Sequence, residues 1–546
     1  MSDFFHRHQS TLSAALAATQ QREYFSAYPE VPSGKLYGET AKSDGEAAFT
    51  ALLERPFDLP HHPNHHNAGA EASPFGRALG ISYPTDTPDA LIAAAREAAP
   101  ALALASIETR VGVCLEALDR LNRISFLMGN ATMHTTGQAF AMAFQAGGPH
   151  AQDRGLEAVA IAYAEMTRFA AQARWEKPQG KAAPIVLQKT WRLRPEGIAL
   201  TIGCNTFPTW NSYPGLFASL ATGNPVIVKP HPKAILPLAL TVRVLREVLI
   251  EAGLSPNAVL LAVDEPGAEI TKALATRAEI KLIDYTGAAS FGQWLRDNAR
   301  QAQLFTEETG VNSVIIAATD DLGAMCANLA FALSLYSGQM CTSPQNIYIP
   351  AGGITTDQGH KSFDEVAMAL VAAVDMLLAD PARADGICGA IANLATQERV
   401  TLAAGQVNGR VLRPGVSEGA QGPLILATQT TEPLANEESF GPIAFVMATR
   451  DIDEAVSHAV QLAKTKGAIT AALYDTNDER ISHIEALFLG AGVNLSINLM
   501  GNIFVNQSAA FSDFHVSGAN PSGNASLTDT AFVASRFRRV MSRRLA

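Results

Sequence analysis

The sequence is poor in cysteine, and its cysteines are not spaced in pairs. Five cysteines occur among 546 residues, and no two of them form a Cys-X-X-Cys pair. A disulfide framework requires paired cysteines, and a zinc ribbon requires them at short spacings. The odd number of cysteines in a long chain therefore predicts free thiols and a reducing, cytoplasmic location.

The sequence also lacks long apolar runs and any excess of positive charge. It contains no charge-free apolar stretch of about 20 residues, the length that a membrane-spanning helix needs. The first residues, MSDFFHRHQSTLSAAL, lack the continuous apolar core of a secretory signal. Because the formal net charge is −11, we expect neither a membrane nor a nucleic acid as a partner.

The chain is long and rich in apolar residues, so it can bury a large core. Hydrophobic residues make up 47% of it and charged residues 17%, and this length predicts two or three domains. Residues 1–100 predict a helical extension with long loops, and an Ala-rich segment of helical period follows, to about residue 174.

After that segment, short β-branched runs alternate with helical segments, which predicts βαβ units and a mostly parallel sheet. The expected strands of a first set are GIALTIG (197–203), NPVIVKP (224–230), NAVLLAV (257–263), EIKLIDYTG (279–287) and NSVIIAA (312–318). A second set contains NIYIP (346–350), PIAFVMA (442–448) and GAITAALYD (467–475). The second set indicates a second α/β domain.

Four histidines lie close together in PHHPNHHN, residues 60–67. Zinc sites usually combine histidine with cysteine or carboxylate ligands, and neither is interleaved here. We therefore predict an exposed polar loop rather than a metal site, and no metal elsewhere.

Cys341 lies in SLYSGQMCTSPQNIYIP, just after an apolar segment that we expect to be a helix beginning at Asp320 or Asp321. A thiolate at such a turn can be exposed to a cleft and attack a carbonyl carbon. Because Cys341 follows the C-terminal end of that helix, the helix dipole does not help to ionise it. A lone cysteine in a loop is more often structural, so other motifs have to support a catalytic role.

Four further motifs place polar or glycine residues next to expected strands or turns. Lys229 ends a buried strand, where ligands bind in open α/β sheets. Gly287-x-x-x-x-Gly292 joins a strand to a helix and offers backbone N–H groups to a phosphate. Glu307 precedes a strand, and Glu438 precedes Phe440-Gly-Pro. Taken alone, each is more often an ordinary turn or surface group.

Taken together, these motifs resemble the aldehyde dehydrogenase superfamily. The matching segments are Asn205-Thr-Phe-Pro, ATGNPVIVKP, TGAASFG, Glu307-x-x-Gly310, GQMC and ESFGP, in the order of that superfamily. The separations from Glu307 to Cys341 and from Cys341 to Glu438 also agree with its pattern. The resemblance implies an α/β fold with a Rossmann-like cofactor domain, an α/β catalytic domain and an oligomerisation arm.

The resemblance also implies a division of the chain. The expected parts are a helical N-terminal extension (1–100), a dinucleotide-binding domain (101–308) with an arm inserted at about 184–195, a catalytic domain (309–495) and a C-terminal oligomerisation segment (496–546). We expect a strand in GNIFVN (501–506) to join the arm, and a homodimer or homotetramer.

By the same resemblance, Cys341 is the nucleophile, and the side-chain amide of Asn205 is expected to stabilise the oxyanion with the backbone N–H of Cys341. Glu307 activates the water that hydrolyses the thioester. The superfamily asparagine aligns with Thr206 when the Phe-Pro pairs are matched, so Thr206 is the alternative to Asn205.

The cofactor is expected to be NADP or NAD. Lys229 would hold the adenosine ribose, the Gly287–Gly292 turn the pyrophosphate, and Glu438, with Phe440 beside it, the nicotinamide ribose. Ala288 leaves that turn only backbone donors. No carboxylate follows Lys229 in Pro-His-Pro, and this favours NADP, whose 2′-phosphate Lys229 and His231 could neutralise.

The substrate expected from the resemblance is a small aldehyde that becomes a carboxylic acid. Longer segments, such as TMHTTGQAFAMAFQAGGPHAQDRGLEAVA, are similar to a phenylacetate-degradation branch of the superfamily in its short form, without a hydratase domain, for which too few residues follow Glu438. A CoA-linked semialdehyde is then the expected substrate. The alternatives are a CoA-acylating dehydrogenase, a catalytically silent binding protein of the same fold, and a thiol hydrolase in which His515 approaches Cys341 in space.

Overall fold

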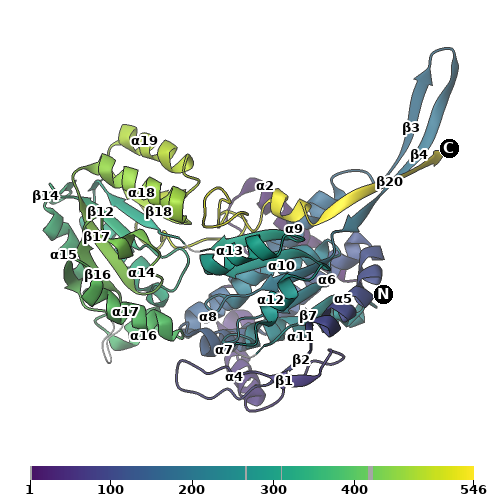
Figure 1. The fold of residues 1–546 in the computed structure, drawn as a ribbon, viewed down its shortest axis with the longest axis horizontal. Helices are drawn as coiled ribbons and strands as arrows, with labels where there is room; N and C mark the ends of the chain where they lie inside the picture. The colour runs from purple at the N-terminus through teal and green to yellow at the C-terminus, as the bar shows by residue number, and fades with distance from the viewer. Residues whose placement is uncertain (1–2, 265–266, 309, 416–421) are drawn as a thin grey trace.

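The computed structural model describes residues 3–264, 267–308, 310–415 and 422–546 and contains two α/β bodies and a long β arm (Figure 1). The predicted α/β architecture is confirmed. Among the described residues, no single helix is both long and apolar enough to cross a membrane. One pair of helices, 88–104 and 107–123, meets that test only jointly and is bent by 117°.

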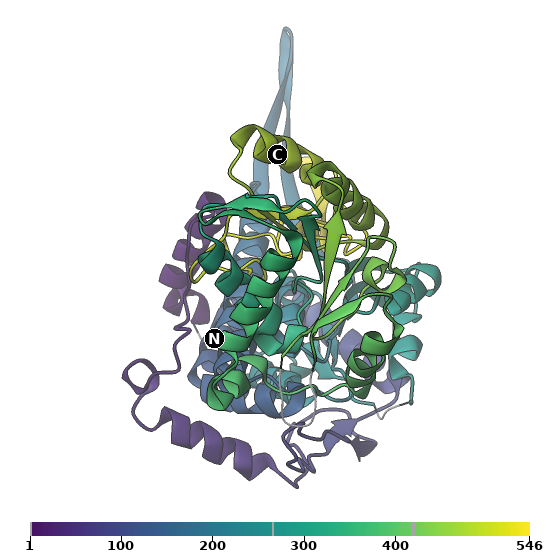
Figure 2. The same ribbon diagram turned by 90° about the vertical axis from the view of Figure 1, so that its left-hand side faces the viewer.

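The N-terminal segment contains several helices and runs along the outside of the molecule (Figure 2). Its helices are α1 (Phe4–Arg7), α2 (Gln9–Gln21), α3 (Gly34–Tyr37), α4 (Ala41–Leu52) and α5 (Pro88–Leu104), and it also contains a short antiparallel pair, β1 (His66–Ala68) and β2 (Tyr83–Thr85). Four further helices follow: α6 (Ile107–Arg123), α7 (Ser125–Thr136), α8 (Phe140–Gly147) and α9 (Pro149–Thr167).

The predicted exposed histidine loop is correct for His61, His65 and His66 but wrong for His62. The ring of His62 is buried, its Nε2 accepts a hydrogen bond from the Leu261 backbone N–H at 3.0 Å, and burial lowers its pKa to about 4. This histidine therefore joins the extension to the first sheet.

The first sheet has five parallel strands in the order β7-β6-β5-β8-β9. The strands are β5 (Ile198–Ile202), β6 (Val226–Lys229), β7 (Val259–Leu261), β8 (Ile280–Gly287) and β9 (Gln303–Glu308), and the helices between them are α10 (Pro208–Ala221), α11 (Leu236–Glu251), α12 (Ile270–Ala275) and α13 (Ala289–Asn298). In chain order this sheet starts with β5, then adds β6 and β7 on one side and β8 and β9 on the other. A topological switch therefore lies between β5 and β8. Ligands bind beyond the carboxyl ends of strands at such a point.

The second sheet has seven strands in the order β15-β16-β17-β12-β10-β18-β19, all parallel except β15. Its strands are β10 (Ser313–Ile316), β12 (Asn346–Pro350), β15 (Arg410–Arg413), β16 (Leu424–Thr428), β17 (Ile443–Thr449), β18 (Thr470–Tyr474) and β19 (Asn494–Ile497). The helices packed around it are α14 (Leu322–Ser334), α15 (Phe363–Leu377), α17 (Leu394–Gln406), α18 (Ile452–Lys466) and α19 (Asp478–Leu489). The expected strands of both sets are thus found, although the run at 312–318 belongs to the second sheet.

The arm is a three-stranded antiparallel sheet in the order β20-β4-β3 that projects away from both bodies (Figure 1). Its strands are β3 (Gln172–Gln179), β4 (Ala182–Pro195) and β20 (Phe537–Leu545), and β4 contains the arm predicted at 184–195. The prediction that residues 501–506 join it is wrong. The amide of Asn328 on α14 donates to the carbonyls of Gly501 and Ile503 and holds that segment against the second body.

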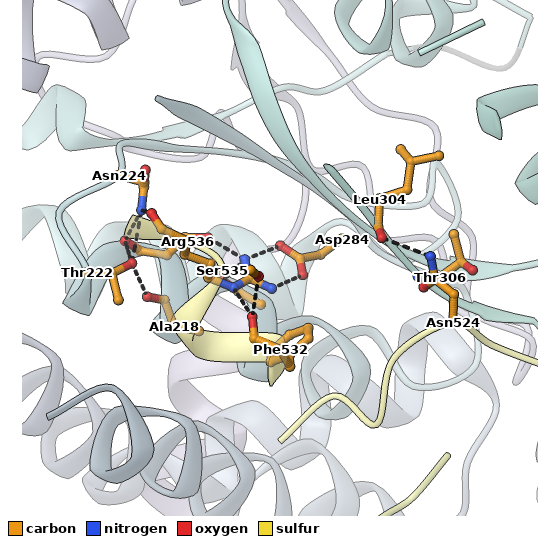
Figure 3. A network of polar contacts seen from close by, with 12 residues as sticks. Ala218, Thr222, Asn224, Asp284, Leu304, Thr306, Asn524, Phe532, Ser535 and Arg536 are labelled. Atoms are coloured by element: carbon orange, nitrogen blue, oxygen red, sulfur yellow. Dashed lines mark hydrogen bonds and ion pairs between the residues drawn. The ribbon is translucent and has the colours of Figure 1, made fainter. Parts of the chain in front are cut away.

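A buried ion pair fixes β20 to the first sheet (Figure 3). The guanidinium of Arg536 is fully buried, donates to both carboxylate oxygens of Asp284 on β8, and reaches Ser219 Oγ at 2.6 Å. The guanidinium carbon of Arg536 also lies 4.3 Å from the ring centre of Phe305 and 4.2 Å from that of Phe532. The C-terminal segment is therefore anchored where it leaves the body.

Replacing Arg536 with alanine should destabilise the protein by about 3–5 kcal/mol, because the Asp284 carboxylate would remain buried without its counter-charge. The measurement is the urea midpoint of unfolding, with Arg544→Ala at the exposed end of β20 as the matched control. Equal midpoints for the two variants would contradict this assignment of the anchor.

Candidate active site

Three segments of the chain meet at the candidate site. Glu307 is the penultimate residue of β9 in the first sheet, Cys341 follows α14 of the second body, and His515 lies in the segment between β19 and β20. Sulfur, carboxylate oxygen and imidazole nitrogen lie within 4.8 Å of one another. The structure therefore brings together the two predicted catalytic residues Cys341 and Glu307, together with the histidine considered only for a hydrolase.

The loop that carries Cys341 is shaped by an unusual turn. Asp321, one of the two residues predicted to begin the preceding helix, caps the start of α14. After the end of α14, Tyr336 and Ser337 have φ angles of 51° and 50°. Such left-handed conformations cost free energy for residues other than glycine. The hydroxyl of Tyr336 offsets this cost by donating to the Thr136 carbonyl at 2.6 Å.

Asn312 then positions the turn that contains the thiol. Its amide nitrogen donates to the carbonyls of Cys341, at 2.8 Å, and Ser343, at 3.0 Å. Its amide oxygen accepts hydrogen bonds from the backbone N–H groups of Ile469 and Thr470. One buried side chain thus fixes the loop of Cys341 against the start of β18.

The surroundings of the Cys341 sulfur do not favour the thiolate. Burial raises the pKa of this thiol well above its ordinary value, and the nearby carboxylate of Glu307 raises it further. Its Sγ lies 3.4 Å from Nε2 of His515. A nucleophile can form here only if a neighbouring group accepts the thiol proton.

Glu307 is buried and held at both oxygens. Its Oε1 lies 2.9 Å from His515 Nε2, and its Oε2 accepts a hydrogen bond from the amide of Asn211 at 2.7 Å. Burial would raise the pKa of this carboxyl, but His515 and hydrogen bonds from Cys341 and Asn211 hold it below the ordinary value of 4.5. The residue is therefore an anion at neutral pH.

Asn211 on α10 is a site residue that the sequence did not reveal, whereas Asn205 was predicted. The amide of Asn205 donates to the Thr135 carbonyl at 3.4 Å, and the Thr206 carbonyl accepts from the side chain of Gln138. The role of Asn205 in stabilising the oxyanion stays a prediction. It requires the Asn205 amide to give up its 3.4 Å hydrogen bond to the Thr135 carbonyl. The sequence feature that could have revealed Asn211 is its spacing. It lies four residues, about one helical turn, after Phe207 of the Asn205-Thr-Phe-Pro motif.

The C-terminal segment reaches the site along β9, as Figure 3 shows for Asn524. Asn524 accepts a hydrogen bond from the Thr306 N–H and donates to the Leu304 carbonyl, and the Glu308 N–H donates to the Ser522 carbonyl. His515 therefore stands on a segment bound to the same strand that carries Glu307.

Two of the predicted cofactor residues, Lys229 and Gly287, lie at the carboxyl ends of strands of the first sheet. Lys229 ends β6, and its Nζ pairs with Asp264 Oδ1 at 2.7 Å. Gly287 ends β8 directly before α13, whose cap residue Ala288 makes no side-chain hydrogen bond. The backbone N–H groups that begin α13 thus remain the expected phosphate donors.

Gly292 allows α13 to pack closely against β9. A Cβ atom there would lie 2.2 Å from Oε1 of Glu308, and Arg296 pairs with that buried carboxylate. The glycine is thus required by packing between α13 and β9, and its direct contact with a cofactor stays a prediction.

Glu438 and Phe440 line the same cavity as Cys341, together with Asn312 and Gly338. The side chain of Arg399 donates to the Phe440 carbonyl and fixes this turn. Their role at the nicotinamide end of a dinucleotide stays a prediction. The prediction that the site holds no metal stays a prediction.

The sequence matches the model of the aldehyde dehydrogenase family over residues 83–529. Curated relatives include a 1-pyrroline-5-carboxylate dehydrogenase of Bacillus subtilis, 26% identical over 59% of this chain and 62% of its own length. Another is an N-succinylglutamate 5-semialdehyde dehydrogenase of Burkholderia thailandensis, 26% identical over 55% and 61%. The matches thus span less than two thirds of these relatives.

Solved structures are similar over more of the chain. An NAD-dependent aldehyde dehydrogenase from Burkholderia multivorans is 51% identical, with a TM-score of 0.96 over 100% of this chain and 99% of that one. An NADP-dependent glyceraldehyde-3-phosphate dehydrogenase from Bacillus halodurans is 18% identical, with a TM-score of 0.67 over 90% and 99%. The second likeness concerns the fold alone.

Proposed function

We propose that this chain, which belongs to the aldehyde dehydrogenase family, oxidises an aldehyde to a carboxylic acid with NAD(P) as the hydride acceptor. The observation that carries this proposal is the approach of Cys341 and Glu307 within one buried site. That site also opens on the cavity lined by Glu438 and Phe440.

Cys341 is the nucleophile of the proposed reaction. Its sulfur attacks the carbonyl carbon of the aldehyde, and backbone and amide N–H groups stabilise the oxyanion, each donor lowering the barrier by about 3 kcal/mol. Bound NAD(P) supplies the acceptor for the hydride that leaves this carbon. The acyl group then remains attached to Cys341 as a thioester.

Glu307 supports hydrolysis rather than transfer to CoA. A buried carboxylate that stays ionised beside the sulfur can take a proton from water as the water attacks the thioester. A CoA-acylating enzyme does not need this base. The CoA-acylating reading is the second candidate, and a silent binding protein is disfavoured by the shared position of the thiol and the carboxylate.

The physiological substrate we propose is a CoA-linked semialdehyde of aerobic phenylacetate degradation. The support is the similarity of TMHTTGQAFAMAFQAGGPHAQDRGLEAVA and related segments to that branch of the family. The curated relatives above are named for semialdehyde or pyrroline-carboxylate substrates, which supports an aldehyde with a second polar end.

The protein is also proposed to be a cytoplasmic homo-oligomer that pairs through its arm. Exposed apolar side chains on the arm, among them Trp175, Ile185 and Val540, suit contact with a second copy. Its edge strands would otherwise leave backbone groups unpaired.

The Asp264 carboxylate supports NAD in preference to NADP. The argument for NADP rested on the absence of a carboxylate after Lys229, but Asp264 after β7 provides one beside Lys229 Nζ. His231 gives no compensating charge, because burial and the nearby lysines lower its pKa to about 4. A 2′-phosphate at this place would therefore meet a fixed negative charge.

The proposed activity is tested with a panel of aliphatic, aromatic and CoA-linked aldehydes, with nicotinamide reduction and product followed with and without CoA. We expect wild-type protein to form free acid without CoA, and Cys341→Ala to lose turnover while it keeps its affinity for the cofactor. Cys388→Ala, a buried thiol elsewhere, is the matched control. Thioester product that requires CoA would favour the second candidate, and substantial turnover by Cys341→Ala would contradict the covalent route.

Replacing Asp264 with asparagine should raise the ratio of kcat/KM for NADP to that for NAD at least about tenfold, equivalent to 1.4 kcal/mol. The reason is that the fixed negative charge facing the 2′-phosphate is removed while Lys229 remains. The exposed Glu269→Gln is the control and should leave the ratio unchanged. An unaltered ratio in Asp264→Asn would refute the assignment of this carboxylate to cofactor choice.

A further inference from the structure

The N-terminal segment covers the outer edge of the first sheet at β7. Strand β7 is the edge strand of that sheet, and an edge strand presents backbone groups that need partners other than a neighbouring strand. The N–H of Ala262 donates inward, to the Val228 carbonyl. The N–H of Leu261 and the carbonyl of Val263, one residue to either side, point outward and meet side chains of the N-terminal segment.

Two side chains of the N-terminal segment bind these outward groups. His62 Nε2 accepts the hydrogen bond of the Leu261 N–H, and the hydroxyl of Thr85 at the end of β2 donates to the Val263 carbonyl at 2.6 Å. Thr85 is only 2% exposed, so water is not available to replace its hydroxyl as a donor. The hydrogen bond of Thr85 therefore fixes the peptide group that directly precedes Asp264.

A third side chain, that of Glu71, fixes the loop after β6. Helix α11 begins after Ile235, whose apolar side chain cannot cap it. The carboxylate of Glu71 takes the place of a cap, because its Oε1 accepts hydrogen bonds from the N–H groups of Ile235 and Leu236. Its Oε2 accepts a hydrogen bond from the hydroxyl of Tyr83 on β2. The loop that starts at Lys229 is thus held at its far end by the N-terminal segment.

These contacts act on the two loops that carry the ion pair of Lys229 with Asp264. The two charged groups lie 2.7 Å apart, and their side chains are only 4% and 8% exposed. A nearly buried ion pair depends on its geometry, because a displaced partner leaves the other charge uncompensated. Asp264 follows the peptide group that Thr85 holds, so the place of its carboxylate beside Lys229 depends on that hydrogen bond.

We propose that Thr85 is a positioning residue for the cofactor, which acts by holding Asp264 beside Lys229 in the site for the adenosine ribose. The inference rests on the proposed function, because it takes this ion pair as the adenosine end of the cofactor site. When the Thr85 hydroxyl is removed, the loop of Asp264 is less ordered before binding, and the cofactor has to restore the arrangement. The N-terminal segment thereby contributes to cofactor affinity and to the choice between NAD and NADP.

The first experiment measures binding and needs no aldehyde. NADH is titrated into the full-length protein, and the change in its fluorescence gives a dissociation constant. In Thr85→Val, which keeps the shape of the side chain but lacks the hydroxyl, we expect this constant to rise roughly 5–20-fold, because a buried carbonyl loses its donor. Thr85→Ser keeps the hydroxyl and should bind NADH with nearly wild-type affinity.

Thr356→Val is the matched control for this titration. The hydroxyl of Thr356 also donates to a backbone carbonyl, that of Gly359 at 2.7 Å, but it lies on the second body, so its loss should not change NADH affinity. Thr85→Ala replaces Thr85→Val if the latter does not fold. Unchanged NADH affinity in the folded Thr85 variant would overturn this inference alone. Absence of NADH binding by the wild-type protein would refute the proposed function, and this inference with it.

The second experiment separates the positioning of Asp264 from a general loss of structure. The dissociation constants of NADH and NADPH are measured for Thr85→Val, Asp264→Asn and the double variant. We expect Thr85→Val to narrow the preference for NADH when Asp264 is present, because the displaced carboxylate no longer faces the 2′-phosphate. In the Asp264→Asn background it should not change this preference further, because the group through which it acts is absent. An equal weakening of both cofactors in both backgrounds would reject the role proposed for Thr85.

Discussion

The hydrogen bond between His515 and Glu307 holds together the site from which the chemistry follows. It spans 2.9 Å inside a buried pocket and joins residues 208 positions apart in the chain. It helps to keep the carboxylate ionised, so Glu307 can act as a base. Burial first, and the Glu307 carboxylate second, raise the pKa of the adjacent thiol.

The rest of the fold maintains this contact from two sides. On one side, the C-terminal segment is bound along β9 by Asn524 and is then anchored by the ion pair of Arg536 with Asp284. On the other side, Asn312 fixes the loop of Cys341 against the second sheet. The arm strand β20 follows directly after Arg536, so the element proposed to contact a second copy continues the segment that carries His515.

The sequence predicted strands in both sheets, because they depend on local periodicity, and the pairing of Cys341 with Glu307, because it follows from the order of motifs in the resemblance. It did not predict the partners that come from distant segments. His515 reaches the thiol only through the path of the C-terminal segment, and Asp264 meets Lys229 only because β6 and β7 are neighbours. Strand β20 was missed because its arginines come in adjacent pairs, 538–539 and 543–544, and do not alternate with the apolar residues as in a half-buried strand.

The central claim is that an acyl group is carried on Cys341 and released by Glu307. It is tested most directly by mixing Glu307→Gln with an active aldehyde and NAD and measuring the mass of the quenched protein and its peptides. The account predicts that one acyl group accumulates on the peptide of Cys341, together with a stoichiometric burst of reduced cofactor and slow turnover. Rapid turnover without any acylated Cys341, or an acyl group found only on another cysteine such as Cys204, would contradict it.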